Sequence, residues 1–193
     1  MLFNSLEFAF FLPIVFLIYW FVLQRNLKLQ NLFIVIVSYI FYGWWDYRFC
    51  FLMALLSVIA WLSAKMIAEN KHRKLFTVIG IVVPLIVLAF FKYFGKVMPL
   101  GISFYTFQAL SYTIDIYRGK EKELPTLLNF ALYTAFFPTV LSGPIERART
   151  LMPQIKNLQR WNFSRFLNGI QLFCWGLVQK IVVADRISEY VGY

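Results

Sequence analysis

Long runs without a charged residue divide the first half of the chain into four segments, each bounded on both sides by a charged residue. A helix needs about 20 largely apolar residues, within a range of about 17 to 25, to cross a bilayer. A charge near the centre of such a helix costs about 2.5–3.5 kcal/mol on insertion scales, so uncharged runs are the primary signal. The pattern predicts four membrane-spanning helices, at Phe8–Gln24, Leu29–Trp45, Phe49–Ala64 and Leu75–Phe91.

Two further uncharged stretches, Val97–Ile114 and Leu124–Ile145, contain helix-breaking residues. Non-helical backbone at membrane depth is tolerated only where protein or a water-filled cavity satisfies its amide groups. We therefore expect interrupted or re-entrant segments that line a site. The last apolar stretch, Phe166–Ala184, is expected to be a further span or a partly buried helix. The breaking residues are Pro99, Gly101, Pro125, Pro138, Gly143 and Pro144.

Charged residues beside the spans predict an orientation in which the amino terminus lies outside, because short cytoplasmic loops are enriched in Lys and Arg. If both interrupted stretches crossed the membrane, the basic loop Glu146–Arg165 would lie outside, so we expect that one of them does not cross completely. Basic residues on the inner side are Arg25, Lys28, Lys65, Lys71, Arg73 and Lys74, whereas the outer link after the second span holds only Asp46 and Arg48.

Aromatic residues cluster at the outer end of the second span, and we interpret them as an interfacial belt in preference to a ligand box. They are Tyr39, Tyr42, Trp44, Trp45 and Tyr47.

The composition agrees with this pattern: 61% of residues are hydrophobic and 15% are charged, against about 45–50% and 25% in soluble domains. The net charge of +10 is spread over short clusters between apolar runs, which indicates topology signals and not nucleic-acid binding. We predict an all-α, polytopic transmembrane protein whose first partner is the lipid bilayer. Cys50 and Cys174 lie in separate apolar stretches and are expected to be packed thiols.

The sequence contains no recognisable catalytic motif of a soluble enzyme. Its one histidine, His72, lies among cations in the run Lys71–Lys74, where neighbouring positive charge disfavours the protonated imidazole. We interpret His72 as a solvated residue and predict no metal site.

Four blocks resemble the membrane-bound O-acyltransferase family, in particular the bacterial branch with the membrane subunit of alginate O-acetylation and the D-alanyl transferase of teichoic acids. The blocks are MLFNSLEFAFFLPIVFLIYW, FYGWWDYRF, MPLGISFYTFQALSYTIDIYRGK and NFALYTAFFPTVLSGPIERARTLMPQ. The resemblance covers residues 1–193 and implies the N-terminal part of such a domain. It places the protein in the bacterial inner membrane as a multi-pass protein.

The family resemblance implies transfer of an acetyl-like group from a cytoplasmic thioester, acetyl-CoA or an acyl carrier protein, towards a hydroxyl of a cell-envelope polysaccharide. It implies an extracytoplasmic acyl-relay protein as a partner and no bound cofactor. Family members use a histidine in the second half of a longer chain, and no histidine follows His72. We therefore expect this sequence to be a fragment that is inactive alone, and we assign it no catalytic residue.

Four residues are candidates for substrate binding. Glu146 and Arg147 follow Gly143 and Pro144 and are expected to hold a donor phosphate through charge-assisted bonds; the alternative is a salt-bridged pair that fixes the loop. Gln108 and Asp115 are seven residues apart and therefore share one helical face. They are expected to line the acceptor path, or else to join helices.

Two other functions remain open from the sequence. One is a non-catalytic membrane scaffold that docks an extracytoplasmic partner. The other is a transporter, which ranks lower because the sequence shows neither repeated halves nor ionisable residues within the four clean spans.

Overall fold

The computed structural model describes residues 5–69, 72–95, 97–121, 123–141 and 143–191. Lys71, one of the residues used to predict the orientation, lies outside these ranges. The chain divides into two compact units, Met1–Gln159 and Arg160–Tyr193, and each is described by itself.

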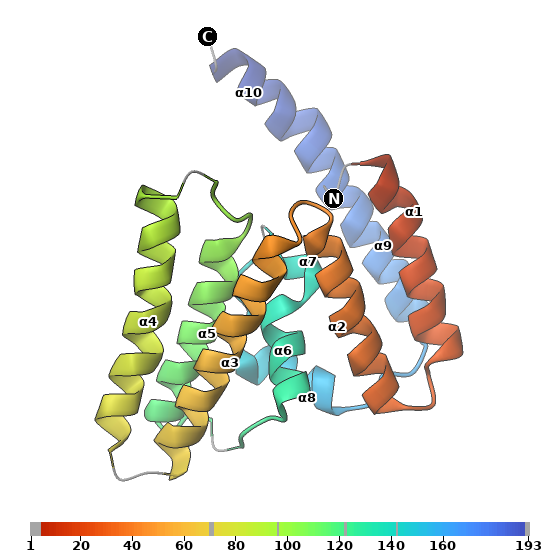
Figure 1. Cartoon of the computed structure of the whole chain (residues 1–193). Helices are drawn as coiled ribbons and strands as arrows, with labels where there is room; N and C mark the ends of the chain where they lie inside the picture. Colours follow the sequence, from red (N-terminus) through yellow and green to blue (C-terminus); the bar gives the residue numbers. More distant parts are fainter. Residues whose placement is uncertain (1–4, 70–71, 96, 122, 142, 192–193) are drawn as a thin grey trace. The chain divides into compact units, whose positions relative to one another are not determined.

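The four spans predicted from the uncharged runs are confirmed as helices of the first unit (Figure 1). Polar residues before the helices define several of their starts: Asn26 Oδ1 accepts from the amides of Lys28 and Leu29, which satisfies two of the free N–H groups of α2. The helices are α1 Leu6–Leu17, continued by the π-helical turn η1 Ile18–Val22, then α2 Leu27–Gly43, α3 Arg48–Glu69 and α4 Arg73–Tyr93.

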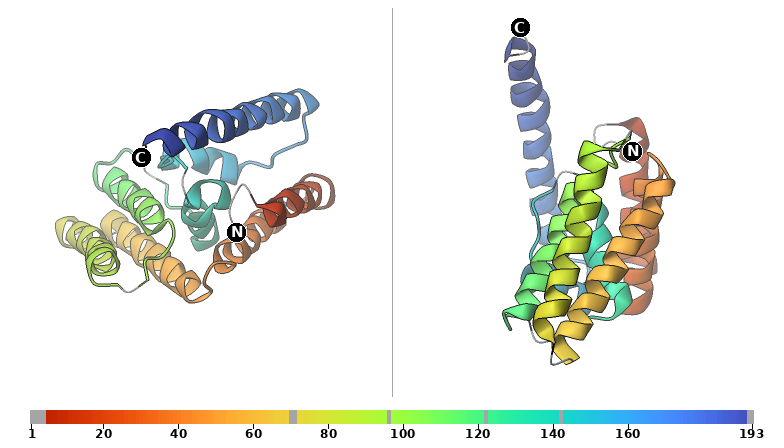
Figure 2. Two further views of the ribbon diagram at one scale, coloured as in Figure 1. Left: turned by 90° about the horizontal axis from the view of Figure 1, so that it is seen from above. Right: turned by 60° about the vertical axis from the view of Figure 1, so that its left-hand side comes forward.

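Helices α3 and α4 have 22 and 21 residues and are long and apolar enough to cross a membrane, whereas Leu6–Val22 and Leu27–Gly43 are shorter apolar helices. Small residues let α3 and α4 approach closely, as is typical of helix pairs in membranes. A Cβ atom added at Gly80 of α4 would lie 2.7 Å from the Cβ of Ser63 on α3. Figure 2 shows α3, α4 and α5 side by side, in agreement with the contacts between them.

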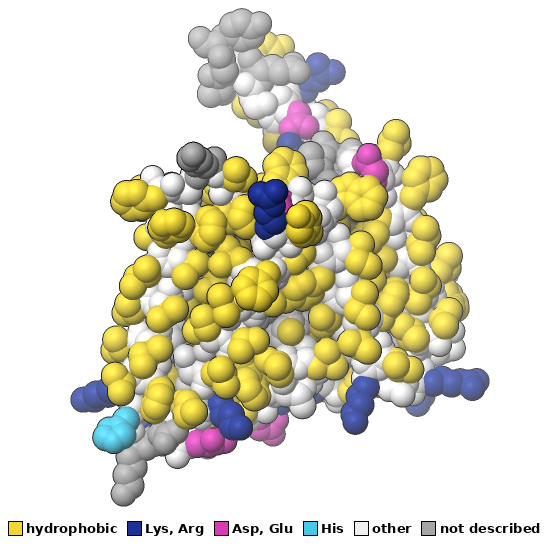
Figure 3. Space-filling model, in the orientation of Figure 1, with side chains coloured by type: hydrophobic (Ala, Val, Ile, Leu, Met, Phe, Trp, Pro, Cys, Tyr) yellow, Lys and Arg dark blue, Asp and Glu magenta, His cyan; other side chains and the backbone are white. Residues whose placement is uncertain are grey.

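Alternating helix directions define two ends of the first unit. We call the end with residues 23–28, 69, 72 and 73 the inner end, following the predicted orientation, and the opposite end, with residues 43–48, the outer end. Figure 3 shows Lys and Arg side chains gathered along the lower, inner edge of the unit. The inner end is therefore the basic end of the unit, and its placement on the cytoplasmic side stays a prediction.

The predicted aromatic belt at the outer end is correct only in part. Trp44, Trp45 and Tyr47 are exposed, as interfacial residues should be, but Tyr42 is only 4% exposed and belongs to the core. Its ring packs against Tyr105, with ring centroids 6.1 Å apart. Tyr42 lies with Phe41 on the buried side of α2, whereas Trp44 and Trp45, which follow the last residue of the helix, are exposed.

Helix α5 spans Ile102–Tyr117 without a break, so the interruption expected within Val97–Ile114 is limited to the residues before the helix. Gly101 immediately precedes the helix with a φ of +70°, a conformation that costs other L-residues about 1–2 kcal/mol. A Cβ atom on Gly101 would lie 2.1 Å from the carbonyl oxygen of Val140. Glycine is therefore required there both by its backbone angle and by the close approach of a second segment.

The stretch Leu124–Ile145 is broken, as predicted. It forms α6 Leu127–Ala135 and α7 Phe137–Val140, separated at Phe136, where ψ is 109°. The amide of Phe137 donates to Ser38 Oγ on α2 at 3.2 Å, so a side chain accepts from backbone near the helix break.

The chain then returns to the inner end, where α8 spans Ala148–Lys156. Asn31, in the second turn of α2, donates from Nδ2 to Asn129 Oδ1 at 3.2 Å and to the carbonyl of Ile155 at 2.9 Å. The start of α6 and the end of α8 therefore lie beside the same inner residue, while α7 approaches Gly101 towards the outer end. The stretch Leu124–Ile145 therefore breaks and turns back towards the inner end, and we call it the re-entrant hairpin; that it does not cross the membrane completely stays a prediction.

The second unit is one long helical rod, made of α9 Phe163–Val178, η2 Gln179–Ala184 and α10 Asp185–Val191. Asn162 Oδ1 caps its start by accepting from the amide of Arg165 at 3.0 Å. The 26 residues Phe163–Ser188 are long and apolar enough to cross a membrane, which supports the prediction of a further span at Phe166–Ala184.

Candidate functional site

Tyr133 on α6 lies at the centre of the polar contacts that hold the re-entrant hairpin. It is fully buried, and its hydroxyl donates to the carbonyl of Glu146 at 2.7 Å and lies 3.3 Å from the carbonyl of Gln108. Gln108 on α5 returns a bond from Nε2 to the carbonyl of Tyr133 at 2.7 Å. Tyr133 thereby joins α6 to α5 and to the backbone at Glu146, which follows the hairpin.

The structure brings two of the predicted site residues, Gln108 and Glu146, together through Tyr133. The side-chain nitrogen of Gln108 is used in a contact between helices, which is the structural alternative that the sequence left open. Glu146 is held through its backbone carbonyl and remains partly exposed. The sequence did not identify Tyr133, because a tyrosine in an apolar helix is usually a core residue.

Arg147 lies at the start of α8 and is exposed. Its carbonyl accepts from the amides of Thr150 and Leu151 at 3.0 and 3.2 Å, so the helix fixes its backbone while its guanidinium remains accessible. Within the described part of the chain, the ion pairs found do not include one between Glu146 and Arg147. Glu146 and Arg147 therefore lie next to the hairpin, but they do not form the salt bridge with each other that the alternative interpretation required.

Asp115 lies on the same buried face of α5 as Gln108, as predicted from their spacing, and is 8% exposed. It belongs to the inner end of the helix and not to the contacts around Tyr133. Its carbonyl accepts from the amide of Lys120 at 2.9 Å, beside Gly119 with a φ of +69°. This is the geometry of a glycine-terminated helix end.

Further polar side chains surround α6, although most neighbouring residues are apolar. Ser57 Oγ of α3 lies 2.7 Å from Thr134 Oγ1, and Trp61 Nε1 donates to the carbonyl of Pro125 at 2.9 Å. Backbone that is not helical must find such partners inside a membrane protein. The hairpin is therefore held by polar groups from α2, α3 and α5.

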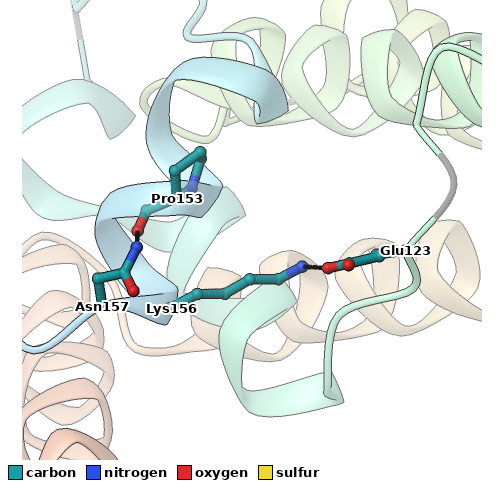
Figure 4. A network of polar contacts seen from close by, with 4 residues as sticks. All are labelled: Glu123, Pro153, Lys156 and Asn157. Carbon is teal, nitrogen blue, oxygen red and sulfur yellow. Dashed lines mark hydrogen bonds and ion pairs between the residues drawn. The ribbon is translucent and has the colours of Figure 1, made fainter.

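An ion pair closes the hairpin at the inner end (Figure 4). Lys156 Nζ donates to Glu123 Oε2 at 2.6 Å, and the Asn157 side chain donates to the carbonyl of Pro153 at 2.8 Å. The hydrogen bond from Lys156 and its positive charge lower the pKa of Glu123 from its ordinary value. The loop before α6 is thus joined to the last turn of α8.

Three buried hydroxyl groups on the outer halves of α2 and α5 were not identified from the sequence. The hydroxyls of Tyr42 and Tyr105 lie close to each other, and, like that of Thr106, they have no other hydrogen-bond partner among the described residues. Such groups are costly to bury unpaired. They are available to a water molecule or to another hydroxyl group near the outer end of the unit.

The returning backbone between α7 and α8 runs along the surface of the first unit. Pro144, Ile145 and Arg147 are exposed, and the residues from Pro144 to Arg147 are not helical. Lipid chains cannot form hydrogen bonds with the free N–H and C=O groups of such backbone. A face of this kind is therefore expected to border protein or water. In the described residues no group of three or more His, Cys, Asp or Glu side chains could hold a metal ion.

Comparisons with known proteins identify relatives over the whole chain. It is 33% identical to the "Probable alginate O-acetylase AlgI" of Pseudomonas aeruginosa, over all of this chain and 42% of that protein. It is 29% identical to the peptidoglycan O-acetyltransferase of Helicobacter pylori, over all of this chain and 46% of that protein. A shorter match, 30% identical over 47% of this chain and 24% of the relative, links it to the teichoic acid D-alanyltransferase of Bacillus subtilis.

No family model matches the chain, and no solved structure matches it. The chain spans less than half the length of the curated relatives that it matches. Its apolar helices make it a membrane protein, and the relatives over its full length are named as O-acetylases or O-acetyltransferases. The chain belongs to the family of membrane-bound O-acyltransferases.

Proposed function

We propose that this chain forms part of an enzyme that transfers a small acyl group, of the acetyl class, to hydroxyl groups of a cell-envelope polysaccharide. The names of the relatives support acyl transfer to envelope polymers. We place the protein in the inner membrane of a bacterium, with a cytoplasmic thioester such as acetyl-CoA or an acyl carrier protein as donor.

The re-entrant hairpin is the observation that carries this proposal. A thioester on one side of a membrane and a hydroxyl on the other can meet only where polar, irregular backbone penetrates the bilayer. The break at Phe136 and the non-helical return to Arg147 supply such backbone. A polar path beside Tyr133 would connect the inner end of the unit with its outer half.

Arg147 is the proposed contact for the phosphate groups of the donor. Its guanidinium is exposed at the inner end and rests on the fixed start of α8. Arginine recognises phosphate oxygens through paired, charge-assisted hydrogen bonds. Glu146, held by Tyr133, would orient the amide or hydroxyl groups that accompany those phosphates.

The acceptor side of the path is proposed to lie between α2 and α5. The neighbouring hydroxyls of Tyr42 and Tyr105, which have no further partner among the described residues, match an acceptor that is itself rich in hydroxyl groups. Gln108 remains a proposed member of this path through its bond to Tyr133, and Asp115 remains a proposed member at the inner end of α5. An extracytoplasmic acyl-relay protein is the proposed partner at the outer end.

The experiment compares bacteria that lack the gene with the same strain carrying the full gene or its Arg147→Gln variant. Loss of the gene should remove O-acyl groups from an envelope polysaccharide, and the full gene should restore them. In membranes, Arg147→Gln should raise the KM for the thioester about 10- to 100-fold, since a hydrogen bond to a charged group contributes about 1.5–3 kcal/mol.

Arg149→Gln is the matched control, because Arg149 is also exposed and lies two residues further along α8. It should change the KM by less than about twofold. Unchanged O-acyl content after deletion of the gene would contradict the proposal and favour a non-catalytic scaffold. An equal rise of the KM in Arg147→Gln and Arg149→Gln would contradict the specific role of Arg147 in binding the donor, but not the proposed reaction.

A further inference from the structure

An open, basic depression lies at the inner end of the first unit, away from the re-entrant hairpin and its proposed site. It is formed where α4 begins and α5 ends. None of its lining residues is acidic, and they are His72, Arg73, Lys74, Leu75 and Tyr117.

Arg73 gives this depression a fixed wall. Its Nε donates to the carbonyl of Ile67 at 3.1 Å, and its Nη2 lies 3.5 and 3.4 Å from the carbonyls of Ile116 and Tyr117. The guanidinium also stands 6.0 Å from the centre of the Tyr117 ring. These contacts tie the ends of α3 and α5 to the start of α4. Arginine carries five N–H donors, and the two on Nη1 have no hydrogen-bond partner among the described residues.

Lys74 adds a second, exposed cation to the depression. Further basic residues, Arg118 and Lys120, follow the end of α5. The described carboxylates of the neighbouring helix ends are Glu69, Glu121 and Asp115, of which Asp115 is buried. The lining itself therefore presents positive charge, with carboxylates only beyond its rim. An anionic group is the chemistry that complements it.

The outer surface of α4 identifies which anion is suitable. Directly beyond Lys74, the exposed side chains along this helix are apolar, with Leu75 57%, Val78 55% and Ile79 40% exposed. A ligand with its phosphate in the depression would have an apolar surface along the helix for its tail. A free phosphate would use only the polar part of this arrangement.

We propose that the depression at the start of α4 binds the phosphate group of an anionic phospholipid of the inner leaflet. Arg73 and Lys74 hold the phosphate, Tyr117 forms the side wall, and the acyl chains lie along Leu75 and Val78. The proposal is independent of the acyltransferase reaction.

The test measures lipid retention by the full protein in detergent, using mass spectrometry of the intact complex. Phosphatidylglycerol, which is anionic, should be retained in preference to phosphatidylcholine, which is zwitterionic. Lys74→Gln should lower the affinity for phosphatidylglycerol about fivefold, the loss expected for one cation near an anionic lipid surface. Lys92→Gln is the matched control, because Lys92 lies at the opposite end of the same helix and should leave the affinity within about twofold.

Three results would overturn the proposal. Equal retention of the two lipids would show that charge does not select the ligand, and equal losses in the two variants would show that binding is not at this depression. Displacement of phosphatidylglycerol by inorganic phosphate or by coenzyme A would show that the depression recognises a free phosphate. Equal melting temperatures of the two variants establish that a specific loss in Lys74→Gln is not a loss of folding.

Discussion

A single hydroxyl group controls the position of the backbone that carries two proposed substrate contacts. The Tyr133 hydroxyl lies 2.7 Å from the carbonyl of Glu146, and Arg147 follows directly in the chain. A hydrogen bond of this kind contributes about 0.5–1.5 kcal/mol net. A free energy of this size changes by about 2- to 12-fold how often the segment at Glu146 and Arg147 moves away from Tyr133.

Replacing Tyr133 by phenylalanine should therefore release this segment while keeping the aromatic packing. We expect hydrogen exchange at the amides of Ile145, Glu146 and Arg147 to become about 2- to 12-fold faster, corresponding to the loss of one such bond. Exchange in α3 should remain unchanged. Hydrogen exchange measured by mass spectrometry on overlapping peptides provides the comparison.

Tyr112→Phe is the matched control. Tyr112 is also buried on the neighbouring α5, with its ring centroid 6.3 Å from that of Tyr133, but its hydroxyl has no hydrogen-bond partner among the described residues. Its removal should leave exchange at Glu146 unaltered. Equal acceleration in both variants would indicate general loosening of the core and not loss of a specific bond.

At this scale the sequence indicated some polar residues and missed others. Gln108 and Asp115 stood out because amides and carboxylates are rare in apolar stretches, and both are buried as expected. Tyr133 and Tyr105 could not be recognised, because tyrosine is common both in cores and in interfacial belts. Only the position of the helix break shows that the Tyr133 hydroxyl reaches a returning backbone.

The re-entrant hairpin is the element that distinguishes this protein from a simple bundle of spans. Its two inner ends are joined by the 2.6 Å contact between Lys156 Nζ and Glu123 Oε2. Because Lys156 lowers the pKa of Glu123, the contact favours the folded state when the carboxylate is ionised. This stabilisation is present above the ordinary pKa of Glu123 and is lost as the pH falls through the lowered value.

Replacing Glu123 by glutamine should reproduce the effect of acid at neutral pH. At pH 7 we expect faster hydrogen exchange in α8 in the variant than in the wild type, compared at the same pH. The difference should shrink as the pH falls through the lowered pKa of Glu123, where the wild-type carboxylate also becomes protonated. The effect should be small, because Glu123 is exposed and water screens the pair.

The variant Asn157→Ala removes a contact that does not titrate, the bond from the Asn157 side chain to the Pro153 carbonyl. Its effect on hydrogen exchange in α8 should be the same at neutral and at acid pH. If Glu123→Gln also behaved identically at neutral and acid pH, the ion pair would not contribute to closing the hairpin.

Helix positions were largely predictable, because charged residues mark where spans must end. The break in Leu124–Ile145 was also predictable, since Pro138 has no amide N–H to continue the hydrogen bonds of a helix. Pro99 and Gly101 carry the same signal but only precede α5. Sequence could not separate these cases, because Gly101 is required by its contact with Val140, which is distant in the chain.

In the described part of the first unit, several helices surround the broken stretch Leu124–Ile145. Helices α2, α3 and α5 all contact α6, and Asn31, Ser57 and Gln108 each bond to it. The arrangement explains why the basic loop after the hairpin can lie on the inner side together with the other basic loops. A complete crossing would place that loop outside, against the charge rule.

The central claim is therefore that the chain enters and leaves the Leu124–Ile145 stretch on the same side of the membrane. Single cysteines introduced at Glu123 and Asn157 test it, once the native Cys50 and Cys174 have been replaced by alanine. A cysteine at Lys28 provides the inner reference, and one at Tyr47 provides the outer reference.

The measurement is labelling of these cysteines in intact cells by a maleimide that cannot cross the inner membrane, followed by labelling of opened membranes. The account predicts that the cysteines at positions 123 and 157 react only after the membrane is opened, like the one at position 28, whereas position 47 reacts in intact cells. Labelling of position 157 in intact cells, with position 123 still protected, would show a complete crossing and contradict the re-entrant hairpin.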